Sequence, residues 1–195
     1  MKRIWALGLS VVVVLLLGGL YFTRRSHTPT GQPALVDLRM TSLLTLQTEF
    51  NRESASSRVI LLLSPTCPTC LQGASAVEDI LNRYPRRQVV VFAVWEPMLP
   101  TDWSKPGTSV LQRLSDNRVR QFWDADHTVA SALKTAEEAG QLHPNCCRRN
   151  GVLWDLIAAY PMGTVWSNTL PLPILFDGTV VRSAHELDPI IARSR

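Results

Sequence analysis

The chain has 195 residues, of which 46% are hydrophobic and 18% charged, with a formal net charge of +4 at pH 7. This hydrophobic fraction is ordinary for a globular protein and excludes a disordered chain. Four of the 20 basic residues precede the first acidic residue, Asp37, so the other 16 basic residues are balanced by 16 acidic ones. The basic isoelectric point therefore gives no support to nucleic-acid binding, which needs a basic surface on the domain itself.

The N-terminal run IWALGLSVVVVLLLGGLYF, residues 4–22, contains no charged residue. About 20 apolar residues are enough to cross a hydrocarbon core as a helix. The run ends without the small-residue cleavage site of a signal peptide. We therefore predict a membrane anchor over residues 1–23, with a transmembrane helix over about 4–22. A polar linker over 24–34 follows, and the basic N-terminus favours an extracytoplasmic (periplasmic) domain.

Residues 35–195 are long enough for one well-buried domain. Helical spacing of leucines predicts a helix over 41–53, and the continuous apolar run 58–63 predicts a strand buried on both faces. A helix over 70–83 and a second buried strand over 88–94 follow. Because a strand, a helix and a strand in succession form a right-handed crossover, these two strands are predicted to pair in parallel.

The middle of the chain is less regular. A proline-rich loop is expected over 95–108, then a short helix over 108–115 and a strand over 118–123. An alanine-rich helix is predicted to end near Gly140. Most of 141–170 has no clear pattern, although WDLIAAY within it is interpreted as one or two helical turns.

The C-terminal segment PLPILFDGTVVR is interpreted as two short strands around an Asp-Gly turn. Ser183, with Glu186 three residues later, has the form of a capping box that opens a last helix through Ile191. The predicted order is α-β-α-β, then an irregular stretch with β-α, then β-β-α.

A Cys-Pro-Thr-Cys motif stands between the predicted buried strand and the following helix. The nucleophile in thiol-disulfide exchange is a thiolate, and the unpaired N–H groups and dipole at a helix N-terminus favour that charged form. The two-residue spacer puts the second sulfur one turn further on, within disulfide reach. We therefore predict that Cys67 is the attacking thiol and that Cys70, more buried, resolves the mixed disulfide.

These segments resemble the thioredoxin-like superfamily, in VILLLSPTCPTC with its helix, in QVVVFAV, and in LPILFDGTVV with the terminal helix. FWDADHTVASAL is similar to a strand-Asp-helix step of the membrane-anchored, extracytoplasmic branch. The resemblance implies an α/β thioredoxin-like fold, a central mixed sheet flanked by helices, here preceded by one transmembrane helix. It also implies a cis-proline against the cysteines, which Pro173 matches best, with Pro171 as competitor. Thr66 stands where thioredoxin has Trp, and Pro173 and Thr66 are the expected substrate contacts.

CxxC is also half of a zinc site, and Cys146 with Cys147, or His143, would have to supply the other half. Adjacent cysteines are awkward zinc ligands, and the strand-CxxC-helix setting favours redox chemistry. A purely structural disulfide across so short a loop would stabilise the fold little. We therefore predict no metal and no organic cofactor, because the cysteines themselves carry the electrons.

Cys146 and Cys147 form a candidate second redox pair, because a disulfide between neighbours closes a strained ring that is easily reduced. They can exchange electrons with Cys67 and Cys70, or trap a soft metal together with His143. The plainer alternative is a pair of loop cysteines with separate partners or none. Five acidic or histidine side chains that follow predicted strand ends are candidate proton acceptors for Cys70, although such residues commonly form turns and caps: Glu96, Asp102, Asp124, Asp126 and His127.

The predicted function is a membrane-tethered thiol-disulfide oxidoreductase that exchanges disulfides with protein thiols through Cys67 and Cys70. One alternative is a membrane-anchored chaperone for copper or another soft metal, with His127 or His143 as an additional ligand. Another is a thioredoxin-like module that only docks a partner. The motif leaves the direction of the redox reaction open.

Overall fold

The computed structural model describes residues 26–194, and a six-stranded mixed sheet runs through its centre. The strand order across the sheet is β1-β4-β3-β2-β7-β8. Strands β1, β4, β3 and β2 are parallel to one another, whereas β7 is antiparallel to both β2 and β8. The strands are β1 (Val36–Asp37), β2 (Ser57–Leu63), β3 (Val89–Trp95), β4 (Val119–Trp123), β7 (Leu156–Tyr160) and β8 (Leu175–Gly178).

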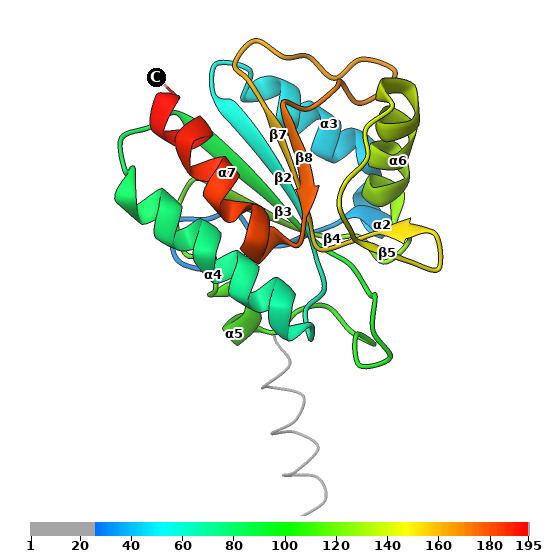
Figure 1. Ribbon diagram of the computed structural model, residues 1–195. Helices are drawn as coiled ribbons and strands as arrows, with labels where there is room; N and C mark the ends of the chain where they lie inside the picture. The colour runs from blue at the N-terminus through cyan, green and yellow to red at the C-terminus, as the bar shows by residue number, and fades with distance from the viewer. Residues whose placement is uncertain (1–25, 195) are drawn as a thin grey trace, which may run out of the picture.

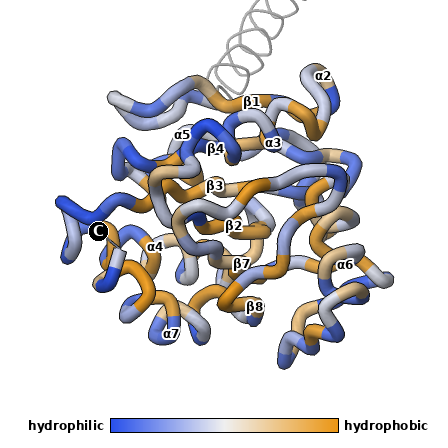
Figure 2. The backbone as a smooth tube through the Cα atoms, turned by 90° about the horizontal axis from the view of Figure 1, so that it is seen from above, coloured by the Kyte–Doolittle hydropathy of each residue, from blue (hydrophilic) through white to orange (hydrophobic). Residues whose placement is uncertain are grey.

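Helices cover both faces of this sheet. Helices α4 and α7 pack side by side on one face, and α3 and α6 cover the other (Figures 1 and 2). A small hairpin of β5 and β6 follows α6. The remaining elements are α2 (Leu38–Thr41), α3 (Leu43–Arg52), α4 (Pro68–Arg83), α5 (Thr108–Leu111), α6 (Thr128–Gly140), β5 (Arg148–Arg149), β6 (Val152–Leu153) and α7 (Val180–Arg193).

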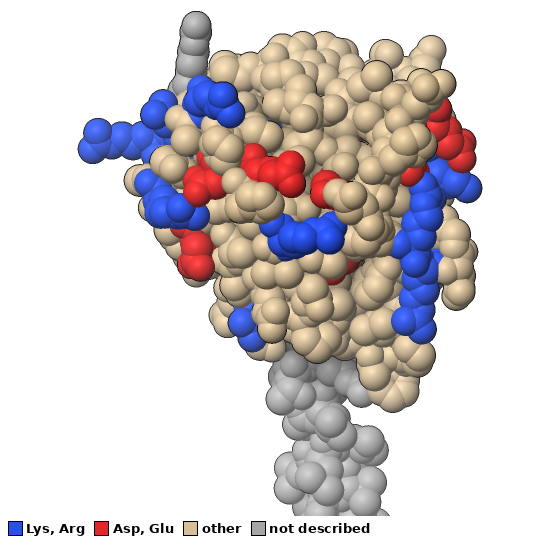
Figure 3. All heavy atoms as spheres, viewed as in Figure 1, with Lys and Arg blue, Asp and Glu red and all other residues tan. Residues whose placement is uncertain are grey.

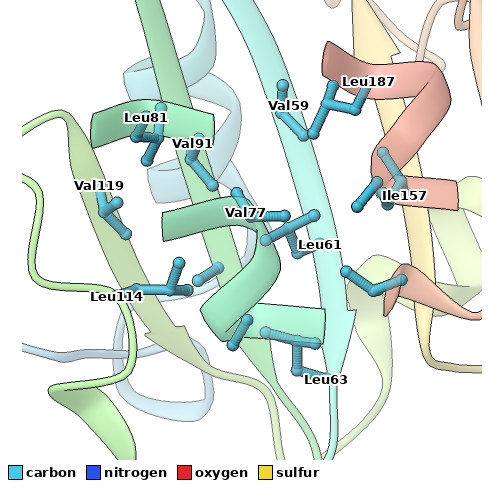
Figure 4. Close-up of a cluster of buried hydrophobic side chains, with 14 of the residues drawn as sticks. Val59, Leu61, Leu63, Val77, Leu81, Val91, Leu114, Val119, Ile157 and Leu187 are labelled. Atoms are coloured by element: carbon cyan, nitrogen blue, oxygen red, sulfur yellow. The ribbon is translucent and has the colours of Figure 1, made fainter. Parts of the chain in front are cut away.

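Alternation along the strands divides the core into two clusters. Val59, Leu61 and Leu63 of β2 point toward α4 and α7, where they meet side chains of β3, β7 and both helices (Figure 4). The residues between them, Ile60 and Leu62, join a second cluster on the side of α3 and α6. A strand that fills a core on both faces has to be apolar at every position, which is why this segment reads as a continuous apolar run.

This architecture is the thioredoxin-like fold that the sequence implies. The parallel pairing of β2 with β3 across α4 is confirmed. The helices expected over 41–53 and 70–83, the strands over 58–63, 88–94 and 118–123, and the helix ending near Gly140 are all present within a few residues of their predicted bounds.

Three local predictions in the C-terminal part of the chain are wrong. WDLIAAY does not form helical turns, because Leu156–Tyr160 is β7, hydrogen-bonded between β2 and β8 and buried throughout. Periodicity alone cannot separate a short buried strand from a buried helical turn. The Asp-Gly turn is also absent from the described chain, since Asp177 and Gly178 end β8 and α7 begins two residues later. Ser183 consequently lies buried inside α7 and caps nothing.

The predicted anchor over 4–22 lies outside the described residues. Within residues 26–194, no helix is both long and apolar enough to cross a membrane. The described part of the predicted linker lies against the domain. The Ser26 hydroxyl donates to the carbonyl of Pro106 at 2.7 Å, and the Gln32 amide donates to the carbonyls of Leu114 and Asp116, each at 2.8 Å.

Charged side chains of both signs are interspersed on the face of the domain seen in Figure 3. Several charged side chains of the described residues are paired across elements. Arg83 of α4 lies 2.7 Å from Asp188 of α7, and Lys105 lies 2.8 Å from Asp37. Exposed pairs of this kind contribute little to stability, so the fold depends mainly on the two apolar clusters.

We expect Leu61→Ala to lower the free energy of unfolding by about 2–5 kcal/mol, because the side chain is fully buried in the cluster between the sheet and helices α4 and α7, and its loss leaves a cavity. Denaturant unfolding of the purified protein measures the change. Leu44→Ala is the matched control, since Leu44 is 67% exposed and its loss should change stability by less than about 0.5 kcal/mol. Equal effects of the two substitutions would contradict the assigned core.

Candidate active site

The candidate site lies at the edge of the sheet where β2 ends. The chain turns there from Leu63 through Ser64 and Pro65 into Cys67, at the N-terminus of α4 (Figure 1). Leu156, the first residue of β7, pairs with Leu62 of β2, and Gly178 at the end of β8 pairs with Leu156. The start of β7 and the end of β8 therefore lie at the same edge as the two cysteines.

Cys67 is the N-cap of α4, as the motif predicts. Its backbone is extended, with φ −79° and ψ 117°, and its Sγ accepts a hydrogen bond from the backbone N–H of Cys70 at 3.3 Å. Pro68 occupies the first turn, where its missing N–H is not needed. The sulfur of Cys67 therefore lies at the positive end of the α4 dipole, beside the backbone N–H groups of the first turn.

The two sulfurs differ in their access to solvent. Cys67 is 5% exposed and lies between the exposed residues Thr66 and Pro68, whereas Cys70 is completely buried. Both are free thiols in this structure. Burial, together with the nearby carboxylate of Asp155, raises the pKa of the Cys70 thiol. Cys67 is thus the thiol that a visiting sulfur can approach, and Cys70 the internal one.

Asp155 is the site residue that the sequence analysis missed. One of its carboxylate oxygens and the sulfurs of Cys67 and Cys70 all lie within 4.8 Å of one another. The residue directly precedes β7, adopts a left-handed backbone with φ 48°, and is 3% exposed. Its carboxylate accepts the backbone N–H of Val180 at 3.0 Å, which fixes its orientation. Burial raises the pKa of Asp155, although the Val180 bond opposes that shift.

A sequence signal for Asp155 did exist. The residue stands immediately before the apolar run LIAAY, and an acid at the start of a central strand would point to the same edge as the CPTC motif. The interpretation of WDLIAAY as helical turns concealed this placement.

The prediction that Pro173 lies beside the cysteines is wrong. Pro173 precedes β8 at the end where Leu175 pairs with Ala159, and the cysteines lie near Gly178 at the opposite end. Pro171 comes still earlier in the chain, before that same far end. The strand beside the motif strand β2 on this side is β7, and the residue before β7 is Asp155 rather than a proline.

Thr66 lies where the sequence predicts, exposed beside Cys67. Its N–H and its hydroxyl both donate to Oδ1 of Asp102, at 3.0 and 2.7 Å. Oδ2 of Asp102 accepts the Ser64 hydroxyl at 2.6 Å and the backbone N–H groups of Met98 and Leu99. Burial raises the pKa of Asp102, but the bonds from Ser64 and Thr66 outweigh it and the net pKa is lowered. Asp102 therefore holds its loop against the motif as a carboxylate rather than accepting a proton.

The other candidate proton acceptors are also engaged elsewhere. Asp124 accepts the Val129 N–H at 2.7 Å and so caps α6, and Asp126 forms an ion pair with Arg39 at 2.7 Å. Glu96 is fully buried and lies 3.0 Å from Nδ1 of His127. It follows Val94 on the face of the sheet that carries α6, opposite the cysteines.

The second cysteine pair lies next to the same edge. Cys146 and Cys147 form a disulfide with each other. A Cβ placed on Gly178 would lie 2.9 Å from Sγ of Cys147 and 3.1 Å from Sγ of Cys146, and it would also collide with the carbonyl oxygen of Asp155. Asp155 is thus near both cysteine pairs: its carboxylate lies beside the sulfurs of Cys67 and Cys70, and its carbonyl oxygen lies, with the sulfurs of Cys146 and Cys147, near the position that a Cβ of Gly178 would take. His143 is exposed on the preceding loop.

Cys67, Cys70 and Asp155 form a set of three potential metal ligands among the described residues. Two thiolates and one carboxylate suit a borderline or soft ion such as Zn²⁺. His127 and His143, the histidines of the copper hypothesis, are not members of this set. Three protein ligands would leave the usual fourth position of a tetrahedral site open.

Comparisons with known proteins give only distant similarities. No protein-family model and no curated protein matches the sequence. A secreted Mycobacterium tuberculosis disulfide oxidoreductase homologous to E. coli DsbE is 15% identical, with a TM-score of 0.41, over 71% of this chain and 81% of that one. The thioredoxin domain of a Bacteroides vulgatus thiol-disulfide oxidoreductase is 9% identical, with a TM-score of 0.38, over 72% and 83%. A putative thioredoxin from Neisseria meningitidis is 18% identical, with a TM-score of 0.37, over 74% and 81%. At these values the similarity is too distant to transfer an activity to this chain.

We expect Asp155→Asn to lower the pKa of the Cys70 thiol, because it removes a negative charge beside a buried sulfur. The titration is followed by the ultraviolet absorbance of the thiolate in a Cys67→Ala background, where Cys70 is the remaining free thiol. Asp126→Asn in the same background is the control, since Asp126 is exposed and paired with Arg39. An unchanged pKa of Cys70 in the Asp155→Asn variant would show that the two groups do not interact.

The Glu96–His127 pair predicts a pH dependence of stability. Burial raises the pKa of Glu96 from 4.5 to about 7, and the bond to Glu96 raises the pKa of His127. Both groups bind protons more tightly in the folded state. The contribution of Glu96 is complete below its unfolded pKa of 4.5 and is lost as pH rises through about 7, and that of His127 is complete below 6.5 and is lost at higher pH.

The free energy of unfolding should therefore fall between about pH 5 and pH 8, by up to about 1.4 kcal/mol per pH unit for each proton linked to folding. Glu96→Gln should flatten this slope, measured by denaturant unfolding across that range. Glu138→Gln is the control, because Glu138 is 66% exposed. A slope that survives Glu96→Gln unchanged would contradict the assignment.

Proposed function

We propose that this protein is a thiol-disulfide oxidoreductase in which Cys67 attacks and Cys70 resolves. The proposal is carried by one observation: the sulfur of Cys67 sits at the N-terminus of α4 and accepts the N–H of Cys70, while Cys70 is buried behind it. A thiol at a helix N-terminus, nearer to the surface than the second thiol behind it, has the arrangement that disulfide exchange needs.

The reaction consists of two exchanges. The thiolate of Cys67 attacks one sulfur of a partner's disulfide, forming a mixed disulfide and releasing the partner's other sulfur as a thiolate. Cys70 then attacks Sγ of Cys67, which forms the Cys67–Cys70 disulfide and releases the partner's second sulfur. The partner gains two electrons and the motif loses two. Exchange is reversible, so the same two steps in the opposite order oxidise a dithiol partner.

The second step needs Cys70 to lose a proton, and its buried position disfavours the thiolate. Asp155 is the proposed acceptor, because its carboxylate lies within 4.8 Å of both sulfurs and burial raises its own pKa. A carboxylate whose pKa is raised is a stronger base and holds the proton more readily. When the reaction runs in reverse, the protonated carboxyl returns that proton to Cys70 as it leaves.

Thr66 is the proposed contact to a protein partner beside the reacting sulfur, because it is exposed next to Cys67 and held in place by Asp102.

We further propose that residues 4–22 anchor the domain to a membrane and that the domain lies on the extracytoplasmic side. The charge-free apolar run, the flanking basic residues and the cysteine content support this location.

A soft-metal binding protein is the second candidate, favoured by the set of Cys67, Cys70 and Asp155. Both functions use the same thiolates, but only disulfide exchange requires the two sulfurs to separate and rejoin. Stoichiometric binding of Cu(I) or Zn²⁺ without any exchange of disulfides would favour the metal function.

We expect Cys70→Ser to accumulate mixed disulfides with partner proteins, because Cys67 can still attack but nothing resolves the product. Non-reducing electrophoresis of the full chain detects these species, and their formation is reversed by a thiol reductant. The double variant Cys67→Ser, Cys70→Ser is the matched control and should form none of them.

Cys67→Ser alone should abolish reduction of insulin disulfides, which is measured by the turbidity of the separated chains. Retention of this activity in Cys67→Ser would refute the assignment of the nucleophile.

A further inference from the structure

The disulfide between Cys146 and Cys147 lies in a rigid frame. The β5–β6 hairpin follows it directly, and its turn residues Asn150 and Gly151 both have positive φ, as a two-residue type I′ turn requires. The strand register pairs Arg148 with Leu153, and the Trp154 N–H donates to the carbonyl of Cys147 at 3.1 Å.

A second attachment holds the other side of this disulfide. Asn145, just before the pair, donates its backbone N–H and its side-chain amide to the two carboxylate oxygens of Asp177 in β8, each at 2.8 Å. β8 ends one residue later at Gly178, against which both sulfurs of the pair are packed. Any side chain at Gly178 would displace the sulfurs, so the absence of a Cβ permits their close approach to the end of the sheet.

Asp155 joins the two cysteine pairs. Its carboxylate lies with the sulfurs of Cys67 and Cys70, and its carbonyl oxygen faces the same point on Gly178 as the sulfurs of Cys146 and Cys147. Asp155 thus lies near both a dithiol, Cys67 with Cys70, and a disulfide, Cys146–Cys147. The chain contains no other cysteine.

We propose that Cys146–Cys147 is a second redox centre that exchanges electrons with Cys67–Cys70 inside the chain. This inference rests on the proposed function, because it uses the same nucleophile, Cys67. The state in the structure supplies both reactants, two thiols and one disulfide.

The exchange balances without an external reagent. The thiolate of Cys67 attacks Sγ of Cys147, the Cys146–Cys147 bond breaks, and Cys146 leaves as a thiolate that takes up a proton. Cys70, having given its proton to Asp155, then attacks Cys67, and Cys147 leaves as a thiolate that is protonated in turn. Two electrons pass from the motif to the vicinal pair. The chain therefore stores four electrons when fully reduced, rather than the two of the motif alone.

The choice of Cys147 as the sulfur that is attacked follows from burial. Cys147 is buried toward Gly178 and Asp155, whereas Cys146 is half-buried. The thiolate released at Cys146 is then the one nearer to solvent. It can react with an outside thiol or disulfide while Cys67 remains free to react with another.

Two double variants of the full chain test the exchange by trapping its intermediate. Cys70→Ser with Cys146→Ser leaves Cys67 and Cys147, which should join in most chains when oxidised glutathione is added at low protein concentration. Peptide mapping without reductant identifies the bond. The matched control, Cys67→Ser with Cys146→Ser, leaves the buried Cys70 and Cys147 and should form far less of an internal bond.

An absence of any Cys67–Cys147 bond overturns the proposal, provided that Cys67 in the same sample reacts with glutathione. If the variants do not fold, the same bond is sought in the wild-type chain, quenched by acid during reduction with less than one equivalent of dithiothreitol, and its absence there is equally decisive. Failure of the proposed function would give a different result: the internal bond forms, but the wild-type chain reduces no insulin and Cys70→Ser traps no protein.

Discussion

The chemistry of this domain depends on one contact, the bond from the Cys70 N–H to the sulfur of Cys67 at the N-terminus of α4. It exists because a strand buried on both faces ends where a helix begins, so that the unpaired N–H groups of the first turn point at the sulfur of the N-cap residue. The core holds this junction in place. Residues of β2 alternate between the two apolar clusters, and α4 packs along α7 on one of them. Loss of that packing would release the sulfur from the dipole and the N–H bond at once.

Residues that lie far apart in the chain meet at the edge of the sheet where β2 ends. Asp102 ties its loop to Ser64 and Thr66 on one side of Cys67, and Asp155 approaches both sulfurs from the start of β7. The pKa values of Asp102 and Asp155 shift in opposite directions because their hydrogen-bond partners differ. Asp102 is surrounded by donors and stays ionised, whereas Asp155 has few donors and a raised pKa, which suits it to take a proton. Glu96, with His127, lies on the other face of the sheet and contributes to stability rather than to the site.

The cysteines at 146 and 147 extend this arrangement beyond a single motif. Their hairpin, their link through Asn145 to Asp177, and the missing Cβ at Gly178 all bring them to the same residue, Asp155. A single CxxC pair must hand its electrons to each partner in turn. Under the proposed internal exchange, two cysteine pairs near one carboxylate would let a different partner react at each pair.

The sequence by itself determined the motif, its position between β2 and α4, the parallel pairing of β2 with β3, and the existence of a second cysteine pair, because these depend on local patterning and on neighbours in the chain. Only the tertiary structure decided which residues join the motif. Pro173 was expected beside the cysteines and lies at the far end of β8, while Asp155 was not expected and lies among them. Both errors have the same cause. Leu156–Tyr160 is a short apolar run whose own pattern fits a helical turn as well as a strand, and it becomes a strand because β2 and β8 hydrogen-bond to it on either side. The pairing of this segment with β2 and β8 cannot be read from its local pattern, and it is this pairing that places Asp155 beside the sulfurs of Cys67 and Cys70.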